Sequence, residues 1–450
     1  MQRRAPRAPL ASPELDTAPA EAPRATLVAA AARDGVGAPP ERPAGALGAL
    51  TVPRYRRYWL GSLASVAAIQ LAALGEGWLI VDELGGSPRV LGTLGAATAV
   101  PTILVNLFGG VLADRVNRRV VMAGTSLCSA ALLLTLTILD VTNTVQIWHV
   151  IAVAALMGVI FGIDNPARNA FFPDLIERRF IQSAVALNAI MWQATRIVAP
   201  MIGGVLVSLA GTAVVFALGT VGFALMLPVL LTLRVAETRP ERSRDVLADL
   251  AGGVRFIAAH RLFALLILLS YSHMFFGLQY FQLMPLVAKT FDRGPGGFGT
   301  LLTMIGVGAV TGTAITLRLQ RFRHQGRLLL SALFATELLI CAFALAPRYE
   351  LALGLLLVAS ICNAIFLIVS MTTLQLRVPD AMRGRVMGIH GITFSMAMLG
   401  GLLGGEIAEL SNVRVALFSG AALMAVVVAA VALTQRELRE LRNDAAAVAA

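Results

Sequence analysis

Twelve predominantly apolar stretches, separated by short polar segments, constrain this chain more than any other feature of its sequence. A helix needs about 20 apolar residues to span a bilayer, and each stretch is near that length. Charged residues make up only 14% of the chain and the mean hydropathy is +0.76, which excludes an ordinary soluble domain. We therefore expect an all-α membrane protein with transmembrane helices at residues 58–83, 88–112, 119–139, 144–165, 181–209, 213–233, 262–288, 297–317, 328–346, 350–373, 385–409 and 413–433.

The positive charges alternate between the two sides of these stretches. From residue 51 onward, the loops on one side carry 25 Lys and Arg residues and those on the other side carry five, while Arg196 falls inside an apolar stretch. Because cytoplasmic loops are enriched in Lys and Arg, we expect both termini to be cytoplasmic. The net charge of +11 thus reflects helix ends, and we expect no nucleic-acid partner.

The two halves of the chain repeat each other at a shift of 206 residues. This shift places Arg115 on Arg321, and Pro173 with Asp174 on Pro379 with Asp380. Matching loops at one offset indicate two parallel, pseudo-symmetric six-helix bundles. The predicted division is a disordered cytoplasmic tail at 1–50, an N-terminal bundle at 51–233, a cytoplasmic linker with a surface helix at 234–261, a C-terminal bundle at 262–433 and a cytoplasmic tail at 434–450.

The stretch GGVLADRVNRR, between the second and third apolar stretches, resembles the G-x-L-a-D-R-x-G-R-R signature of the major facilitator superfamily, with Asn117 at a position where many members carry Gly. The resemblance implies a cytoplasmic gate in which Asp114 faces the N-terminus of the eleventh helix, where the helix dipole favours negative charge. It also implies that nearby arginines pair with acids at the end of the fourth helix. The gating residues implied in this way are Gly110, Asp114, Arg115, Arg118, Arg119, Asp164 and Asp174.

Four local runs resemble the branch of this superfamily that contains the enterobactin exporter and the macrolide efflux pumps. They are GSPRVLGTLGAATAVP, DNPARNAFFPDLI, ALNAIMWQATRIVAPMIGGVL and QLRVPDAMRGRVMGI. The third run includes Pro200, Gly203 and Gly204, which resemble an antiporter motif of the fifth helix that is linked with export, with Ala199 in place of its first Gly. Helix packing around a proline bend is the alternative explanation. The R-x-x-Q-G motif of many drug/proton antiporters is missing from the fourth helix.

Ionisable residues inside apolar stretches are candidates for function because charge is costly in hydrocarbon. Arg196 could bind an anionic substrate group or a coupling carboxylate, or form a structural ion pair within its bundle. Glu76 could exchange protons or be an exposed residue at the outer end, and His273 could change charge near neutral pH or be simply hydrogen-bonded. Glu337 could be a carboxyl enclosed in its bundle. These coupling candidates are Arg196, Glu76, His273 and Glu337.

Polar and aromatic residues on the helices that resemble cavity-lining ones are candidates for contact with the substrate. Each could instead join helices to one another. They are Gln70, Asn106, Asn188, Trp192, Gln279, Asn363, His390 and Phe394.

The sequence predicts a secondary transporter of the bacterial inner membrane. We expect a monomer that exports a small amphipathic molecule (a drug, macrolide-like compound or siderophore) by alternating access, in exchange for protons. Import or uniport of a metabolite, and a receptor or partner protein without transport, are the alternatives. The sequence has no G-x-x-x-x-G-K-S/T loop, which would bind the phosphates of ATP, and no group of residues typical of a metal or catalytic site. Its cysteines lie within apolar stretches, at Cys128, Cys341 and Cys362. We therefore expect neither an enzyme nor a cofactor.

Overall fold

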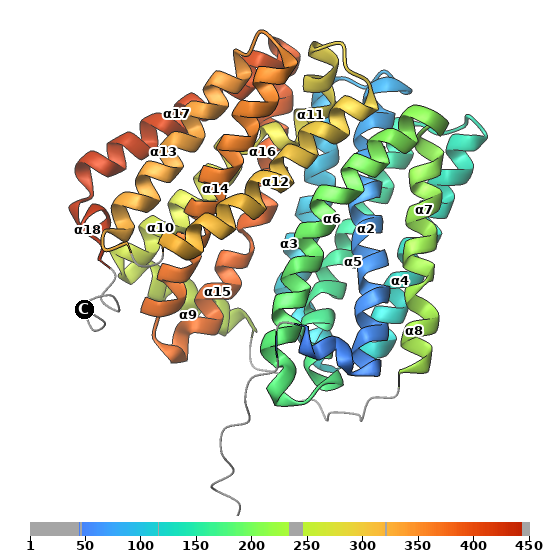
Figure 1. The fold of residues 1–450 in the computed structure, drawn as a ribbon, viewed down its shortest axis with the longest axis horizontal. Coiled ribbons are helices and arrows are strands. Elements are labelled where there is room, and N and C mark those ends of the chain that lie inside the picture. Colours follow the sequence, from blue (N-terminus) through green and yellow to red (C-terminus); the bar gives the residue numbers. More distant parts are fainter. Residues whose placement is uncertain (1–44, 46, 116, 234–245, 320–321, 443–450) are drawn as a thin grey trace, which may run out of the picture. The chain divides into compact units, whose positions relative to one another are not determined.

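The computed structural model describes residues 45, 47–115, 117–233, 246–319 and 322–442, without the side chains of 107–115 and 246–249. Within these residues the regular secondary structure is helical (Figure 1). Twelve helical segments are long and apolar enough to cross a membrane, which confirms the predicted all-α, twelve-span fold. The cytoplasmic and outer ends of the segments are named below by the orientation that their charges predict.

The spans follow the apolar stretches closely, and the fourth extends furthest beyond its predicted end, to Phe171 rather than residue 165. Nine of the twelve are built on a single main helix each: α2 (Pro53–Asp82), α3 (Pro88–Arg115), α4 (Arg118–Val141), α5 (Ile147–Phe171), α6 (Ile181–Ala210), α12 (Pro295–Leu319), α13 (Gln325–Ala344), α14 (Tyr349–Arg377) and α17 (Val413–Thr434).

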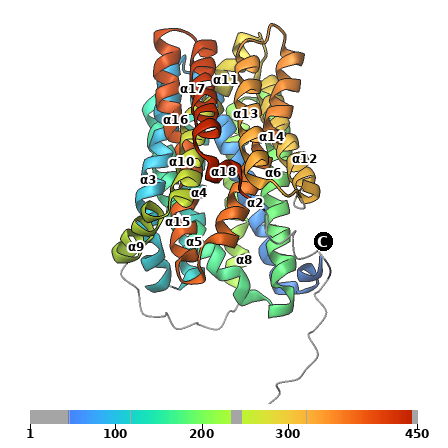
Figure 2. The same ribbon diagram turned by 90° about the vertical axis from the view of Figure 1, so that its left-hand side faces the viewer.

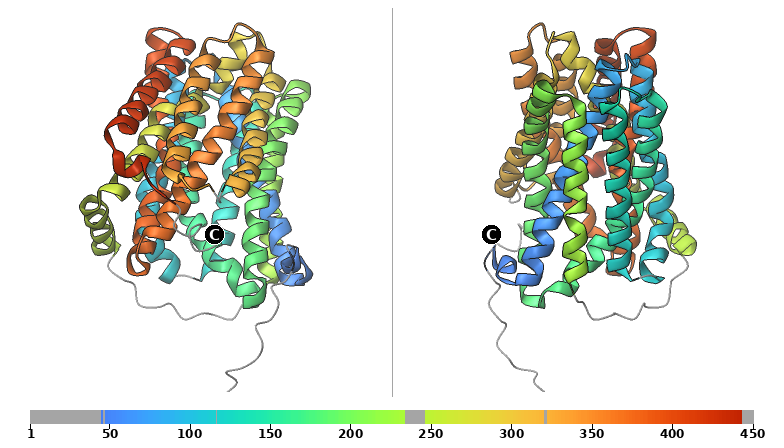
Figure 3. Two further views of the ribbon diagram at one scale, coloured as in Figure 1. Left: turned by 60° about the vertical axis from the view of Figure 1, so that its left-hand side comes forward. Right: turned by 90° about the vertical axis from the view of Figure 1, so that its right-hand side faces the viewer.

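The other three spans are interrupted. The sixth consists of α7 (Thr212–Ala224) and α8 (Met226–Thr232), which follow one line in Figures 1 and 3. Its break lies three residues before Pro228, which has no N–H to donate to the Ala224 carbonyl. The eleventh span consists of α15 (Asp380–Gly391) and α16 (Thr393–Leu410). The seventh joins α10 (Arg261–Ser272) to α11 (Tyr280–Thr290) through a single π-helical turn, His273–Gly277.

Short helices flank the spans. A 3₁₀ turn (Gly48–Thr51) precedes α2, two more (Phe172–Leu175 and Arg178–Phe180) join α5 to α6, and α18 (Arg436–Arg439) follows α17. Helix α9 (Val246–Ala259) packs against α15 and α10. The predicted tails at 1–50 and 434–450 and the linker at 234–261 fall largely or partly outside the described residues, so the domain limits stay predictions.

Two helix pairs form the most extensive contacts between the first six spans and the last six. Helix α3 packs along α16, and α6 packs along α12 (Figures 1 and 2). Under the 206-residue shift the second span corresponds to the eighth and the fifth to the eleventh, so the two contacts exchange with each other. The repeat seen in the sequence therefore matches a repeat in the packing.

Glycines allow the backbones to approach closely along both pairs. A Cβ at Gly92 of α3 would lie 2.5 Å from the Gly401 carbonyl oxygen of α16, and a Cβ at Gly204 of α6 would lie 2.7 Å from the Pro295 carbonyl oxygen of α12. A side chain at either position would push the helices apart. Both contacts lie in the outer parts of their helices, so we call them the outer seams.

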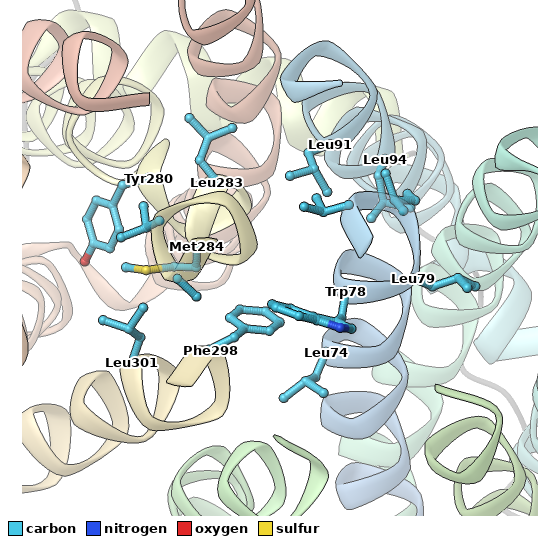
Figure 4. Packing of buried hydrophobic residues seen from close by; sticks show 14 of the residues in the cluster. Leu74, Trp78, Leu79, Leu91, Leu94, Tyr280, Leu283, Met284, Phe298 and Leu301 are labelled. Carbon is cyan, nitrogen blue, oxygen red and sulfur yellow. The ribbon is translucent and has the colours of Figure 1, made fainter. Parts of the chain in front are cut away.

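Side chains complete the junction at the outer ends. The rings of Trp78 and Phe298 stack with centroids 6.1 Å apart (Figure 4). Lys289 Nζ lies 3.0 Å from the Asp82 carboxylate, and Arg89 donates to both carboxylate oxygens of Glu406 at 2.7 and 2.8 Å. Among ion pairs between described residues, these two connect the first six spans to the last six.

Candidate functional site

A buried polar cluster connects three spans of the C-terminal half. His273 Nδ1 lies 2.6 Å from Glu337 Oε1, and His273 Nε2 lies 2.9 Å from Asn363 Oδ1. The side chains of His273 and Glu337 have no exposed surface. These residues were separate candidates in the sequence, two for coupling and one for the cavity, and the fold brings all three together.

The backbone of the seventh span positions this cluster. His273 begins the π turn, and the Leu278 N–H donates to the His273 carbonyl across it. Single π turns within α-helices are frequent at functional sites. At Gly277 a Cβ would come within 2.5 Å of Glu337 Oε1 and 2.8 Å of His273 Nδ1, so the pair fits only because that residue has no side chain.

The geometry requires one proton between the imidazole and the carboxyl group. Nε2 must carry a proton because it faces the amide oxygen of Asn363, which can only accept. Either an imidazolium then donates from Nδ1 to a carboxylate, or a carboxylic acid donates to the unprotonated Nδ1 of a neutral imidazole, and the pair is neutral in both cases. Glu337 Oε2 is buried and has no hydrogen-bond partner among the described residues. This atom can accept a second proton. The cluster can therefore exist in two states that differ by one positive charge.

Arg196 lies on α6 in the N-terminal half, and its side chain is exposed. Among the described residues no acidic side chain pairs with it and no hydrogen bond involves its guanidinium. The backbone at Arg196 packs against α12, because a Cβ at Gly306 would lie 3.2 Å from the Arg196 carbonyl oxygen. The structural ion pair considered from the sequence is thus not formed with any described residue.

A small cavity of about 30 Å³ lies one turn from Arg196, between α2, α5 and α6. Asn188 and Trp192, both predicted cavity residues, line it. Sequence reasoning missed the other lining residues of this polar and aromatic wall. The i, i+4 spacing of Asn165 and Asn169 on one helix face was the signal that could have found them. The missed residues include Tyr58, Trp59, Asn165, Arg168, Asn169 and Phe172.

The predicted gate is described in part. Arg118 donates to Asp174 at 2.9 Å and to the Ala170 carbonyl at 3.0 Å, and Arg119 donates to the Leu231 carbonyl at 2.6 Å. Asp164 instead forms an ion pair with Arg168, one turn further along the same helix, and accepts a hydrogen bond from Thr125 at 2.6 Å. The side chains of Asp114 and Arg115, and the contacts of Gly110, lie outside the described residues.

The remaining candidates are more dispersed. Glu76 is buried rather than exposed at the outer end of its span. Gln279 is buried and donates to the Ala416 carbonyl at 2.6 Å, so it joins helices, and His390 is buried beside Thr393. Phe394 and Asn106 are exposed and Gln70 is half-buried.

The antiporter-like motif of the fifth span takes part in helix packing. Gly203 packs against Leu71 of α2, whereas Pro200 and Gly204 face α12 in the outer seam.

Comparison with protein families gives a match over nearly the whole described chain. The family model described as transmembrane secretion effector matches residues 44–449. The enterobactin exporter EntS of Shigella boydii serotype 4 (strain Sb227) is 26% identical over 367 residues, which cover 78% of this chain and 86% of the exporter. EntS of Escherichia coli O139:H28 is also 26% identical over 367 residues, which cover 78% of this chain and 86% of that exporter.

Comparison with solved structures gives the same fold at low identity. The crystal structure of the nucleoside transporter NupG has a TM-score of 0.64 at 15% identity and covers 86% of this chain and 99% of its own. A bacterial homologue of the lysosomal transporter Spinster, inward-facing and occupied, has a TM-score of 0.67 at 14% identity and covers 86% of this chain and 98% of its own. These likenesses show the major facilitator fold alone.

Proposed function

The chain belongs to the transmembrane secretion effector family of major facilitator transporters, which are multi-pass membrane proteins and not enzymes, and we propose that it exports a small amphipathic molecule across the bacterial inner membrane in exchange for protons. The direction is supported by its relatives, which are named as exporters of enterobactin. The coupling is supported by one observation, the fully buried contact between His273 and Glu337.

Alternating access would operate through the outer seams. In the present arrangement the outer ends are held together by Arg89–Glu406 and Asp82–Lys289. Exposed ion pairs of this kind each contribute about 0–1 kcal/mol, so they can be broken and reformed in each cycle. Opening to the outside would separate α3 from α16 and α6 from α12. On the cytoplasmic side, the closed state would be held by Asp114 and its neighbours, as the family motif implies.

Proton exchange would accompany this movement. With one shared proton, the His273–Glu337 pair is neutral and tolerates its apolar surroundings. A second proton, taken up from the outside, makes the pair cationic, and a buried charge is costly unless water reaches it or packing changes. Loss of that proton to the cytoplasm restores the neutral pair. Each proposed transport cycle therefore moves one proton from the outside to the cytoplasm.

Flux measurements in everted membrane vesicles test this proposal. A panel of cationic drugs, macrolides and catecholate siderophores is offered with an imposed proton gradient, with and without a protonophore. Export predicts accumulation in everted vesicles that the protonophore abolishes. Accumulation only in right-side-out vesicles would instead identify an importer, and flux that ignores the protonophore would identify a uniporter.

The uniporter has one specific observation in its favour. The fourth span carries no arginine in the middle of its apolar stretch, where many drug/proton antiporters carry the R-x-x-Q-G motif. Proton release on substrate addition separates the two mechanisms directly. An antiporter releases protons from purified protein when substrate binds, and a uniporter does not.

A further inference from the structure

Arg196 is a permanent cation in the middle of a membrane span, and its charge has no described partner. An arginine stays protonated in proteins, and a charged side chain within the bilayer is costly unless paired or hydrated. Among the described residues, no Asp, Glu or backbone oxygen forms an ion pair or hydrogen bond with this guanidinium. The exposed guanidinium is therefore stabilised by water, or by a group that is not among the described residues.

The face of α6 that carries Arg196 is turned away from lipid. The exposed apolar residues Val198, Val205 and Leu209 define the lipid face of this helix. At 100° per residue, Arg196 lies on the opposite side, between Pro200, which contacts α12, and Gly203, which contacts α2. The exposed surface of Arg196 thus belongs to the space between the N-terminal and C-terminal halves.

Helix contacts relate the depth of Arg196 to that of the His273 cluster in the opposite half. The Arg196 carbonyl contacts Gly306 of α12, and Gly312, six residues nearer the cytoplasm, contacts Ile361 of α14. Two residues further along α14 is Asn363, the hydrogen-bond partner of His273. The Arg196 side chain slants toward the N-terminus of its own helix, which is also the cytoplasmic direction. Asn363 therefore lies eight helix residues, roughly 12 Å along the helix axes, nearer the cytoplasm than the Arg196 carbonyl, and the Arg196 side chain covers part of this offset.

The surface next to Arg196 is aromatic and polar. Trp192 lies one turn earlier on α6 and lines the small cavity with Asn188 and Trp59. An aromatic ring of a ligand can pack on these side chains while the amides hydrogen-bond to its substituents. A guanidinium beside them matches a carboxylate, phenolate or sulfonate on the same ligand.

We propose that Arg196 binds an anionic group of the exported molecule, so that the substrates are amphipathic acids with an aromatic or apolar body. This inference rests on the proposed export function. It also explains how the transporter avoids cycling without cargo. Closure of the halves around an unpaired cation is costly, whereas an anion neutralises Arg196 and allows the loaded protein to pass through its closed state.

The test uses export assays in everted vesicles with ligands matched in shape and different in charge. Each set contains an acid, its amide and its amine: naphthalene-2-carboxylate, naphthalene-2-carboxamide and 2-(aminomethyl)naphthalene, with larger aromatic sets built in the same way. The wild-type protein should transport acids and reject the amides and amines. Arg196→Gln should lower acid transport at least 30-fold, the loss expected from removing one partner of a desolvated charge pair (roughly 2 kcal/mol or more).

Two further variants keep the inference falsifiable. Arg196→Lys retains the charge and should recover part of the acid transport, whereas Arg196→Glu should reverse the preference toward amines. Membrane content of each variant is measured to exclude misfolding. Acid transport that is unchanged in Arg196→Gln, or wild-type transport of the amides and amines as fast as that of the acids, would overturn the inference and leave the export function intact. Absence of gradient-driven transport of every compound in wild-type vesicles would overturn the proposed function itself.

Discussion

His273 and Glu337 are 64 positions apart in the chain, on the seventh and ninth spans, yet Nδ1 of one lies 2.6 Å from Oε1 of the other. Neither side chain reaches solvent. The pair thus forms a neutral, proton-carrying unit inside the C-terminal half, and Asn363 fixes the far side of the imidazole. This relationship gives the proposed coupling a defined location.

Replacing Glu337 should uncouple substrate transport from proton transport. Glu337→Gln keeps a hydrogen bond to His273 but cannot bind and release the proton. We expect gradient-driven accumulation in everted vesicles to fall at least tenfold, while exchange of substrate down its own gradient persists. Glu350→Gln is the matched control, because Glu350 pairs with Arg293 at the exposed outer end of the same half. Equal losses in both variants would contradict the assignment.

Filling the space at Gly277 should disturb the same pair without changing its chemistry. In Gly277→Ala the new methyl group would overlap Glu337 and His273, and overpacking of this kind costs about 1–3 kcal/mol. We expect a lower unfolding temperature in nanodiscs and reduced proton release on substrate addition. Gly354→Ala in α14 is the control, because no atom lies within 4 Å of its Cβ position. Wild-type coupling in a well-folded Gly277→Ala protein would show that the contact is dispensable.

Widening one outer seam should shift the protein toward the outward-open state. A methyl group in Gly92→Ala would meet the Gly401 carbonyl oxygen at 2.5 Å, so α3 and α16 must separate. Spin labels on the outer ends of these two helices should report a larger population of long distances. Gly124→Ala in α4, which has open space at its Cβ position, should leave the distribution unchanged. An unchanged distribution in both variants would remove the seam from the gating mechanism.

The stability of the folded protein should depend on pH through Glu83, which directly follows the outer end of the first span. Burial raises the pKa of Glu83 above its ordinary value of 4.5 despite the hydrogen bond from Thr212, and nearby Asp140 and Asp82 raise it further. A raised pKa means that the folded protein favours the protonated form. Its contribution to stability is therefore greatest below pH 4.5 and declines as the pH rises through the raised pKa.

Thermal unfolding in nanodiscs between pH 4 and 8 checks this sign. Glu83→Gln should lessen the decline toward neutral pH and raise the unfolding temperature there. Because the Glu83 side chain is only partly desolvated and still contacts water, the change should be small. Glu440→Gln provides the opposite case, because the hydrogen bond from Arg436 lowers the pKa of Glu440 and that variant should lose stability at neutral pH. A steeper decline in Glu83→Gln would refute the assignment.

The family motif leads to a prediction for Asp114. Asp114→Asn should remain in the membrane at wild-type levels but transport more slowly, because the cytoplasmic ends would no longer be held closed by its charge. Quantitative immunoblotting and vesicle flux measure the two properties. Asp174→Asn, which would remove only the ion pair to Arg118, should have the smaller effect. Wild-type flux through a well-expressed Asp114→Asn protein would contradict the gating role.

The spans and the family could be predicted from the sequence because their signals are local. Transfer of a helix into lipid depends on about 20 consecutive residues, and the contiguous motif GGVLADRVNRR needs no tertiary information. The interruptions were not visible in the same way. The π turn at His273 does not disturb the apolar pattern that predicted the seventh span. Pro228, by contrast, was a readable signal for the break in the sixth.

By itself the sequence determined that this chain crosses a membrane twelve times, because hydrophobic length acts on each segment independently. It also supplied the ionisable residues within the spans. Only the tertiary structure decided that His273 meets Glu337 while Arg196 meets no described acid. The physical reason is that such contacts depend on the rotation and depth of each helix relative to its neighbours. Those are set by close packing, such as that at Gly277 and Gly306, between residues far apart in the chain.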